Sequence, residues 1–278
     1  MKYLDVKLFI AAVLGLFAMN TYGLDLYVFN GDSDTGFIVD TDAQTFTSFD
    51  TTDADIGYAV AVTDRVILGD RDDRVAAEYD LNGNFTGNTF PGGGNFSELL
   101  DGTTNGIDAN YGIECCDTTI SVTVADLNWQ NQSVLFDIPF NGSGITYDPS
   151  TDTLWVSTFD NGDIRNFSLT GTELSSFPAT DISAGDACCM AYDTETDTLW
   201  IGENNTNVLY NYSKTGTLIE SITIPGWDPG NIYGAEAVMV GALPESVAVP
   251  TINIFGMLLM ALLVLVVGLT VKRNQRFN

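Results

Sequence analysis

The pattern of hydrophobic and polar positions along the chain repeats at an interval of 45 residues. The stretch YDPSTDTLWV at 147–156 recurs as YDTETDTLWI at 192–201, and NFSLTGT at 166–172 recurs as NYSKTGT at 211–217. Apolar and polar residues alternate over short segments, and turns rich in Asp, Asn and Gly separate these segments. Alternation with a period of two is typical of β-strands with one buried face. The pattern therefore predicts four short strands in each repeat.

Weaker copies of the repeat precede these two. They read FIVDTDAQTFTSFD at 37–50, AEYDLNGNF at 77–85 and VADLNWQNQSVLFDIP at 124–139. The turns between the third and fourth strands then lie 40, 46, 42 and 45 residues apart, at Asp42, Asn82, Asn128, Thr170 and Thr215. Four strands in about 40–50 residues are typical of one blade of a β-propeller. Five turns predict five blades.

The first and last strands of the pattern predict how the ring closes. No strand precedes DLYVFN at 25–30, so the first blade lacks its innermost strand. The segment GAEAVMVGA at 234–242 is a strand without a blade of its own, and it can supply the missing strand. Closure removes exposed sheet edges, which otherwise favour aggregation. We therefore expect an all-β fold, a single β-propeller of five four-stranded blades closed by a C-terminal strand.

The blade pattern resembles the NHL and YVTN-type propellers of bacterial surface and periplasmic proteins. The resemblance covers most of residues 24–242 and rests on generic blade motifs, so it implies the fold and no activity. The tryptophans of the two DTLW segments, Trp155 and Trp200, occupy equal positions in neighbouring blades. Equal positions predict packing between blades rather than a role in binding.

Both ends of the chain carry apolar segments that predict export and membrane insertion. Residues 1–23 have the layout of a signal peptide, with Lys2 and Lys7 flanking the start of a short apolar run. Residues 252–271 carry no charge and are long enough to cross a bilayer as a helix. The basic residues of 272–278 place that tip in the cytoplasm. We expect the propeller ectodomain, 24–242, to be secreted across the inner membrane, with 243–251 as a linker.

The C-terminal tail resembles the VPTLxxWG form of the PEP-CTERM-like sorting signals. The residues that carry the resemblance are Val249, Pro250, Thr251, Phe255 and Gly256. The resemblance implies recognition by an exosortase-type processing enzyme and display on the cell envelope or cell surface. Phe255 stands where the family has tryptophan, so the sequence leaves open whether the tail is cleaved or remains as a membrane anchor.

Charge and composition exclude several classes of function. Residues 24–245 hold 36 acidic residues and five basic ones, a net charge of about −31, which disfavours nucleic acid and anionic lipid as partners. The chain contains no histidine, which excludes Ser-His-Asp catalysis and imidazole metal sites.

Four cysteines form two adjacent pairs, Cys115 with Cys116 and Cys188 with Cys189. An exported protein meets an oxidising compartment, so we expect disulfides that brace the ring near its channel mouth. Four cysteines allow three pairings. Side chains of neighbouring strand residues point to opposite faces, so a self-paired bond needs a strained turn. A self-paired ring resembles the vicinal disulfide of quinone-dependent alcohol dehydrogenases, whose docking motifs are missing here, and a zinc site of four thiolates is a further alternative.

Acidic turns are candidates for calcium, because calcium takes six to eight oxygen ligands. The candidate ligands are Asp32, Asp34, Asp40 and Asp42, whose spacing does not complete an EF-hand loop. Asx turns explain such residues without a metal. The sequence therefore requires no cofactor and leaves calcium as a possibility.

The sequence predicts a propeller binding module without catalysis, displayed on the envelope. Its expected ligand is an extracellular or envelope polysaccharide, or a protein. The alternative is a secreted hydrolase of the glycosidase or lactonase type that uses carboxylates facing the channel with optional calcium. Candidates for those carboxylates are Asp108, Glu114, Asp186 and Glu236. A third possibility is a structural envelope component without a ligand.

Overall fold

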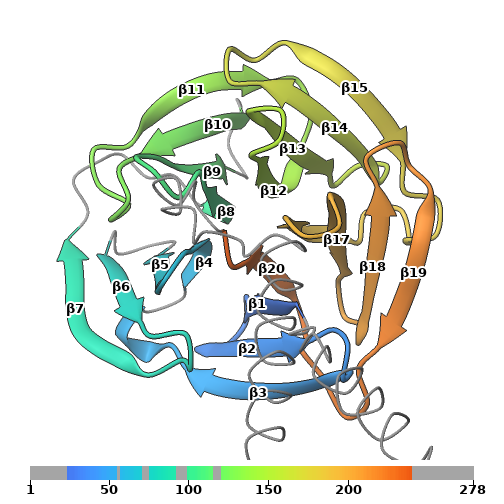
Figure 1. Cartoon of the computed structure of the whole chain (residues 1–278). Helices are drawn as coiled ribbons and strands as arrows, with labels where there is room; N and C mark the ends of the chain where they lie inside the picture. The colour runs from blue at the N-terminus through green and yellow to red at the C-terminus, as the bar shows by residue number, and fades with distance from the viewer. Residues whose placement is uncertain (1–23, 55–56, 71–74, 92–98, 115–119, 240–278) are drawn as a thin grey trace, which may run out of the picture. The chain divides into compact units, whose positions relative to one another are not determined.

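The computed structural model describes residues 24–54, 57–70, 75–91, 99–114 and 120–239. They form five four-stranded antiparallel sheets arranged as blades around one axis (Figure 1). The predicted signal peptide, sorting motif and apolar span 252–271 lie outside the described residues. Within the described part, no helix is both long and apolar enough to cross a membrane.

Each blade runs from an inner strand at the axis to an outer strand at the rim. Blade 1 consists of β20 (Ile232–Ala237), β1 (Asp25–Asn30), β2 (Thr35–Asp40) and β3 (Thr45–Asp50). Blade 2 consists of β4 (Gly57–Val62), β5 (Val66–Asp70), β6 (Val75–Tyr79) and β7 (Phe85–Pro91), preceded by the 3₁₀ turn η2 (Thr52–Ala54). Blade 3 consists of β8 (Leu99–Thr104), β9 (Asn110–Glu114), β10 (Ile120–Ala125) and β11 (Ser133–Ile138). Blade 4 consists of β12 (Gly142–Asp148), β13 (Thr153–Thr158), β14 (Asp163–Ser168) and β15 (Glu173–Pro178). Blade 5 consists of β16 (Ala187–Asp193), β17 (Thr198–Glu203), β18 (Val208–Ser213) and β19 (Leu218–Thr223).

The predicted fold class is confirmed, including the way the ring closes. β20 pairs antiparallel with β1, so the last strand of the propeller is the inner strand of the first blade. The five turns predicted from the repeat all connect the third and fourth strands of a blade. Ring closure therefore joins the two ends of the repeat array through hydrogen bonds between backbones.

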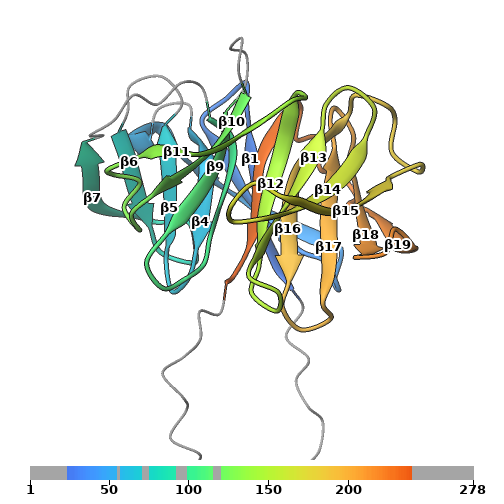
Figure 2. The ribbon, with the colours of Figure 1, turned by 90° about the horizontal axis from the view of Figure 1, so that it is seen from above.

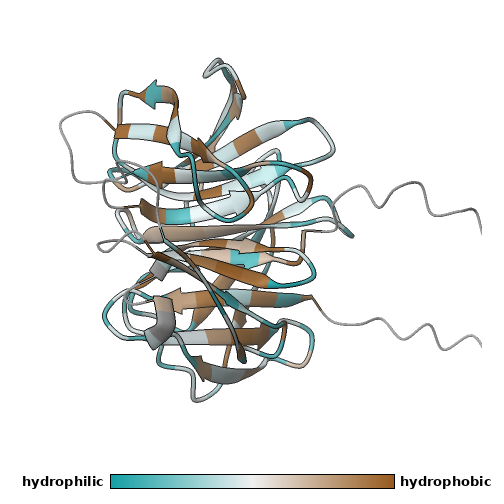
Figure 3. Ribbon diagram, turned by 90° about the vertical axis from the view of Figure 1, so that its left-hand side faces the viewer, coloured by the Kyte–Doolittle hydropathy of each residue, from teal (hydrophilic) through white to brown (hydrophobic). Residues whose placement is uncertain are grey.

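The hydrophobic core is divided into five clusters, one between each pair of adjacent blades. Alternate residues of a strand contribute to the clusters on its two sides. In β13, Leu154 and Val156 pack toward blade 3, whereas Trp155 packs toward blade 5. Trp155 and Trp200 are both buried, which confirms the prediction that they pack between blades. Figure 3 shows the resulting bands of hydrophobic residues along the strands, with hydrophilic residues concentrated in the turns.

An aromatic ring from one blade covers a glycine turn of the next at three interfaces. Phe49 lies against Gly83, Phe136 against Gly171, and Phe177 against Gly216, each glycine having a positive φ. Any side chain at these glycines would meet the ring at less than 3 Å. The repeated TG and NG turns are thus required both by the backbone conformation and by contact with the neighbouring blade.

All five inner strands contain a β-bulge at the same position. The residues at which the strand register shifts are Tyr58, Leu100, Ser143, Cys188 and Tyr233. A bulge increases the local twist and bends the strand. The inner strands consequently come close to one another: a Cβ atom on Gly234 of β20 would lie 2.1 Å from the carbonyl oxygen of Tyr58 in β4.

The ring has two different faces. We call the face where the inner strands begin the upper face and the face where they end the lower face. Among the described residues, the connections between blades lie on the upper face, including the eight-residue loops 179–186 and 224–231. The described residues begin at Leu24 and end at Met239, and both of these ends lie on the lower face (Figure 2). The loops between blades therefore project away from the chain ends.

The contact between blades at a glycine turn gives a test of this packing. We expect Gly216→Ala to lower the free energy of unfolding by about 1–2 kcal/mol through its φ of 83° and by about 1–3 kcal/mol more through contact with Phe177. Chemical denaturation measures the loss. Gly226→Ala is the matched control, because Gly226 has a φ of 75° but no atom within 4 Å of the added methyl group. Equal losses in the two variants would contradict the proposed role of the aromatic contact.

Candidate functional site

The axis of the ring is occupied by the carboxyl group of Asp101, which lies in inner strand β8. Its Oδ1 accepts hydrogen bonds from the backbone N–H groups of Gly102 (2.8 Å) and Ala235 (3.1 Å). Its Oδ2 accepts from Ile145 (2.9 Å) and Met190 (3.1 Å). These donors belong to the inner strands of blades 3, 1, 4 and 5, so one side chain connects four blades.

The surroundings of Asp101 act on its ionisation in two opposite directions. The side chain is fully buried, and this burial, together with Cys189, raises the pKa of Asp101 well above that of an ordinary carboxyl group. The N–H groups of Ile145, Gly102 and Met190 act in the opposite direction. All four hydrogen bonds use the carboxyl oxygens as acceptors, which is what an ionised carboxylate offers.

Asp101 was not among the carboxylates predicted to face the channel. The residues that follow the bulge in the five inner strands are Ala59, Asp101, Gly144, Cys189 and Gly234. Four of the five are small, so a single acidic residue at this register is the signal that could have identified it. The weak sequence similarity of blades 2 and 3 to the later repeats concealed that register.

Glu236, a predicted channel carboxylate, does lie at the axis, two residues further along β20. It is fully buried, and its Oε1 accepts a hydrogen bond from the N–H of Ala237 at 3.0 Å. Burial raises the pKa of Glu236 well above its usual value, while the hydroxyl groups of Thr103 and Thr146 oppose that rise. Among the described residues, Oε2 of Glu236 has no hydrogen bond of standard geometry.

The other predicted channel carboxylates do not join Glu236. Asp108 lies in the exposed β8–β9 turn of the lower face, where its Oδ1 accepts from the Asn105 amide at 2.8 Å. Glu114 ends β9, and Asp186 precedes β16, both toward the upper face. Catalysis by paired carboxylates requires two such groups on either side of one substrate bond. The structure does not bring these four residues together at one end of the ring.

The expected disulfide at Cys188 and Cys189 is absent, which corrects the prediction for this pair. Both residues are buried free thiols with their sulfur atoms 3.9 Å apart. The Cys188 thiol donates instead to the carbonyl oxygen of Gly202 at 3.3 Å. The prediction relied on the oxidising compartment of an exported protein, whereas the fold packs both thiols in the core cluster between blades 5 and 1, with Cys188 as the extra residue of the β16 bulge. Cys115 and Cys116 lie outside the described residues.

The candidate calcium ligands separate into two turns on opposite faces. Asp32 and Asp34 lie in the β1–β2 loop of the upper face, and Asp40 and Asp42 in the β2–β3 turn of the lower face. Oδ1 of Asp40 accepts from the Ala43 N–H at 2.8 Å, and Oδ2 of Asp32 accepts from the Asn231 amide at 2.6 Å. Across the described ranges, no group of three or more acidic or cysteine side chains could hold a metal ion.

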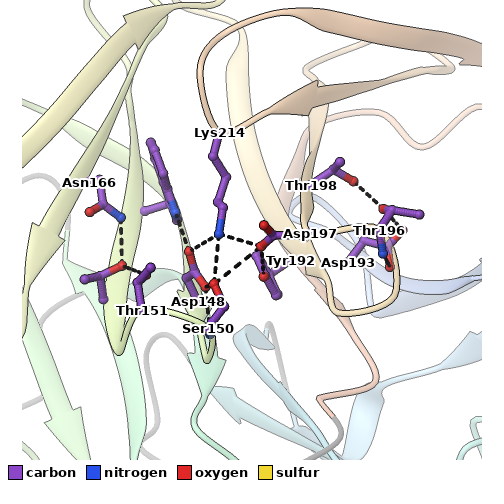
Figure 4. A network of polar contacts seen from close by, with 12 residues as sticks. Asp148, Ser150, Thr151, Asn166, Tyr192, Asp193, Thr196, Asp197, Thr198 and Lys214 are labelled. Atoms are coloured by element: carbon purple, nitrogen blue, oxygen red, sulfur yellow. Dashed lines mark hydrogen bonds and ion pairs between the residues drawn. The ribbon is translucent and has the colours of Figure 1, made fainter.

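The acidic turns of blades 4 and 5 are joined by a lysine (Figure 4). Nζ of Lys214, in the β18–β19 turn, lies 3.0 Å from Oδ2 of Asp148 and 2.5 Å from Oδ1 of Asp197. It also donates to Oγ of Ser150 at 2.9 Å. Asp148 is buried and belongs to blade 4, whereas Asp197 belongs to blade 5. Lys214 therefore links two blades on the lower face.

A hollow of about 460 Å³ opens at the upper end of blade 1. It is lined by Asp34, Thr35, Ser48, Phe49, Asp50 and Thr52. Oδ1 of Asp34 is buried and lacks a hydrogen-bond partner among the described residues. The Thr52 N–H donates to Oδ1 of Asp50 at 2.9 Å and lowers the pKa of Asp50, so this carboxylate is ionised at neutral pH. The hollow offers two carboxylates, three hydroxyl groups and one aromatic ring, with no basic side chain in its lining.

The lysine link predicts a pH dependence of stability. Burial alone would raise the pKa of Asp148, but hydrogen bonds from Ser150 and Lys214 outweigh it, and the pKa lies below the reference value of 3.8. A lowered pKa contributes stability above pH 3.8 that is lost as the pH falls through the folded-state pKa. We expect Lys214→Met to cost about 1–3 kcal/mol of unfolding free energy at pH 7, and the difference from the parent chain to shrink in acid.

Arg165→Met is the control for this experiment. Arg165 pairs with Asp163 at 3.1 Å and Glu173 at 3.2 Å within blade 4, on partly exposed surface. Removing such a pair costs about 0–1 kcal/mol. Denaturation curves across the acid range compare the two variants. A Lys214→Met loss that equals the Arg165→Met loss, or that stays constant in acid, would show that the link contributes no special stability.

Comparison with known proteins supports the fold. No family model matches the chain, and no curated protein matches it either. A chain of the nidogen–laminin complex is similar at 12% identity with a TM-score of 0.53, covering 78% of this chain and 100% of that one. A protein of unknown function from Bacteroides caccae (11% identity, TM-score 0.45) covers 72% of this chain and 73% of its own. A functionally unknown protein from Desulfotomaculum acetoxidans (16%, TM-score 0.41) covers 77% and 74%. The chain is a five-bladed β-propeller, similar in fold to the chain of the nidogen–laminin complex.

Proposed function

We propose that this protein is a binding module without catalysis, displayed on the cell envelope, and that it binds an extracellular or envelope polysaccharide. The observation that carries the proposal is the hollow at the upper end of blade 1, which is lined by carboxylates and hydroxyl groups. Sugar hydroxyl groups donate hydrogen bonds to carboxylates. They both donate hydrogen bonds to Ser and Thr hydroxyl groups and accept hydrogen bonds from them. The hollow thus has the chemistry that a sugar chain requires.

The charge of the hollow restricts the class of polysaccharide. Asp34 and Asp50 line it without a basic side chain, and residues 24–245 as a whole carry a net charge of about −31. Negative charge disfavours a polymer that carries carboxylate or sulfate groups. The ligand we propose is therefore a neutral or amine-bearing polysaccharide.

The position of the hollow supports display of the protein on a membrane. The described chain ends lie on the lower face, whereas the hollow lies on the upper one. The basic tip at 272–278 and the uncharged run at 252–271 suit a membrane-anchored tail, and residues 249–256 suit processing by an exosortase-type enzyme. A tether at the lower face would direct the hollow away from the membrane.

A protein ligand is the second candidate. The chain of similar fold with a TM-score of 0.53 comes from a complex of two proteins, nidogen and laminin. Propellers present loops between blades on one face, and such loops suit protein partners as well as sugars. An envelope protein as ligand would use the same upper face.

A blocking substitution tests the role of the hollow. We expect Ser48→Trp, which fills the hollow from β3, to reduce retention of the full chain on immobilised polysaccharide of the producing organism at least tenfold. Ser48 is exposed in an outer strand, so the indole group replaces solvent rather than packed atoms. The chain, purified in detergent, is followed by retention on the polymer, and the length of the polymer is measured afterwards.

The matched control is Ser221→Trp, because Ser221 occupies the equivalent place in the outer strand of blade 5. Both substitutions expose one indole group on an outer strand, so non-specific adhesion affects them equally. Retention that is lost only in Ser48→Trp supports the proposal. Retention unaffected by either substitution would exclude the hollow, and shortened polymer would favour the hydrolase alternative.

A further inference from the structure

The inner strands of a propeller are the edges of their sheets. Each has one row of backbone N–H and C=O groups paired with the next strand and another row directed at the axis. Unpaired backbone groups that are buried cost free energy, so native structures supply partners for nearly all of them. In this ring the partner for the N–H groups at one level is a side chain, that of Asp101.

The four residues that donate to Asp101 occupy the same position in their respective inner strands. Each is the second residue after the bulge of its inner strand: Gly102 in β8, Ile145 in β12, Met190 in β16 and Ala235 in β20. The same bulge in each blade therefore turns the same N–H group toward the axis. The corresponding residue of β4 is Val60, and the described residues show no hydrogen bond from it to Asp101.

Four N–H groups that converge on one point create a positive electrostatic potential there, as they do in the backbone nests that bind anions. The residues after the bulges are small in the other blades, with Ala59, Gly144 and Gly234 leaving room at the axis. A carboxylate with two oxygens, each accepting two hydrogen bonds, satisfies the four donors.

A second set of backbone N–H groups near the axis, closer to the lower face, donates to other side-chain acceptors. Two residues further along the strands, the Thr103 hydroxyl accepts from the Tyr147 N–H at 3.0 Å, and Glu236 accepts from the Ala237 N–H. Tyr147 and Ala237 are again equivalent positions of their inner strands. N–H groups directed at the axis are thus a property of the ring, and the acceptors are side chains that happen to belong to β8 and β20.

We propose that the bulges of the inner strands form an anion-binding site on the axis of the ring, and that the carboxylate of Asp101 is its built-in ligand. The site itself is made by backbone atoms of blades 1, 3, 4 and 5. A chain without this carboxylate should therefore bind a small monocarboxylate from solution in its place. This inference concerns the axis and is independent of the proposed sugar-binding hollow.

Chemical rescue tests the proposal directly. Asp101→Ala keeps the Cβ atom and removes the carboxylate, which leaves a space that formate fits. We expect the full-length variant to lose on the order of 10 °C in Tm, because four buried donors lose their acceptor. Formate at about 100 times its dissociation constant should restore on the order of 5–10 °C.

Three controls separate binding at the site from general salt effects. The parent chain, whose site is filled, should show no such gain in formate. Asp101→Asn retains the volume of the side chain, so it should be destabilised without responding to formate. Pivalate at the same concentration carries the same charge but is too bulky for the site, and it should fail to rescue Asp101→Ala.

If Asp101→Ala does not fold when it is produced, a refolding experiment tests the proposal instead. Asp101→Ala is refolded in formate or in pivalate, and the recovered folded fraction is measured by tryptophan fluorescence. Recovery in formate alone supports the site. Equal recovery in both salts, equal response of Asp101→Asn, or no recovery in formate would each overturn the proposal.

Discussion

The carboxylate of Asp101 satisfies a constraint that the propeller fold imposes on itself. Five sheets meet at one axis by their edges, and each edge directs backbone N–H groups into the interior. A sheet edge on the surface can hydrogen-bond to water, but these edges are buried among small side chains. One side chain with four acceptor positions resolves the conflict for four blades at once. The packing of the inner strands depends on that acceptor.

The bulges and the small residues of the inner strands belong to the same solution. A bulge in every inner strand bends it at the same height, and the following residue is small in four of the five strands. The approach of Gly234 to the Tyr58 carbonyl shows how little space remains for a side chain. At the rim, in contrast, blades are joined by separate contacts such as Phe177 on Gly216 and Lys214 on Asp148. Stability at the axis is shared among blades, whereas stability at the rim is local to each pair.

The distribution of acidic residues follows from these structural roles. Asp148 and Asp197 hold a lysine between blades, Asp40 caps a turn, and Asp101 fills the axis. Asp34 and Asp50 differ because they line an open hollow, and one oxygen of Asp34 has no partner among the described residues. A chain with many acids offers many candidate sites, and the contacts of each carboxylate decide which of them remains available to a ligand.

The sequence alone determined the number of blades, the strand order within them and the closing role of β20, because these follow from local alternation and a repeat length. It also determined the burial of Trp155 and Trp200, since equal positions in a repeat have equal neighbours. Only the tertiary structure decided which carboxylate joins the inner strands, because Asp101 accepts hydrogen bonds from residues 44, 89 and 134 positions away. It also decided the state of Cys188 and Cys189, because both thiols are packed between blades 5 and 1 and Cys188 is the extra residue of a bulge. Periodicity is a local property of the chain, whereas convergence on an axis is a property of all five blades together.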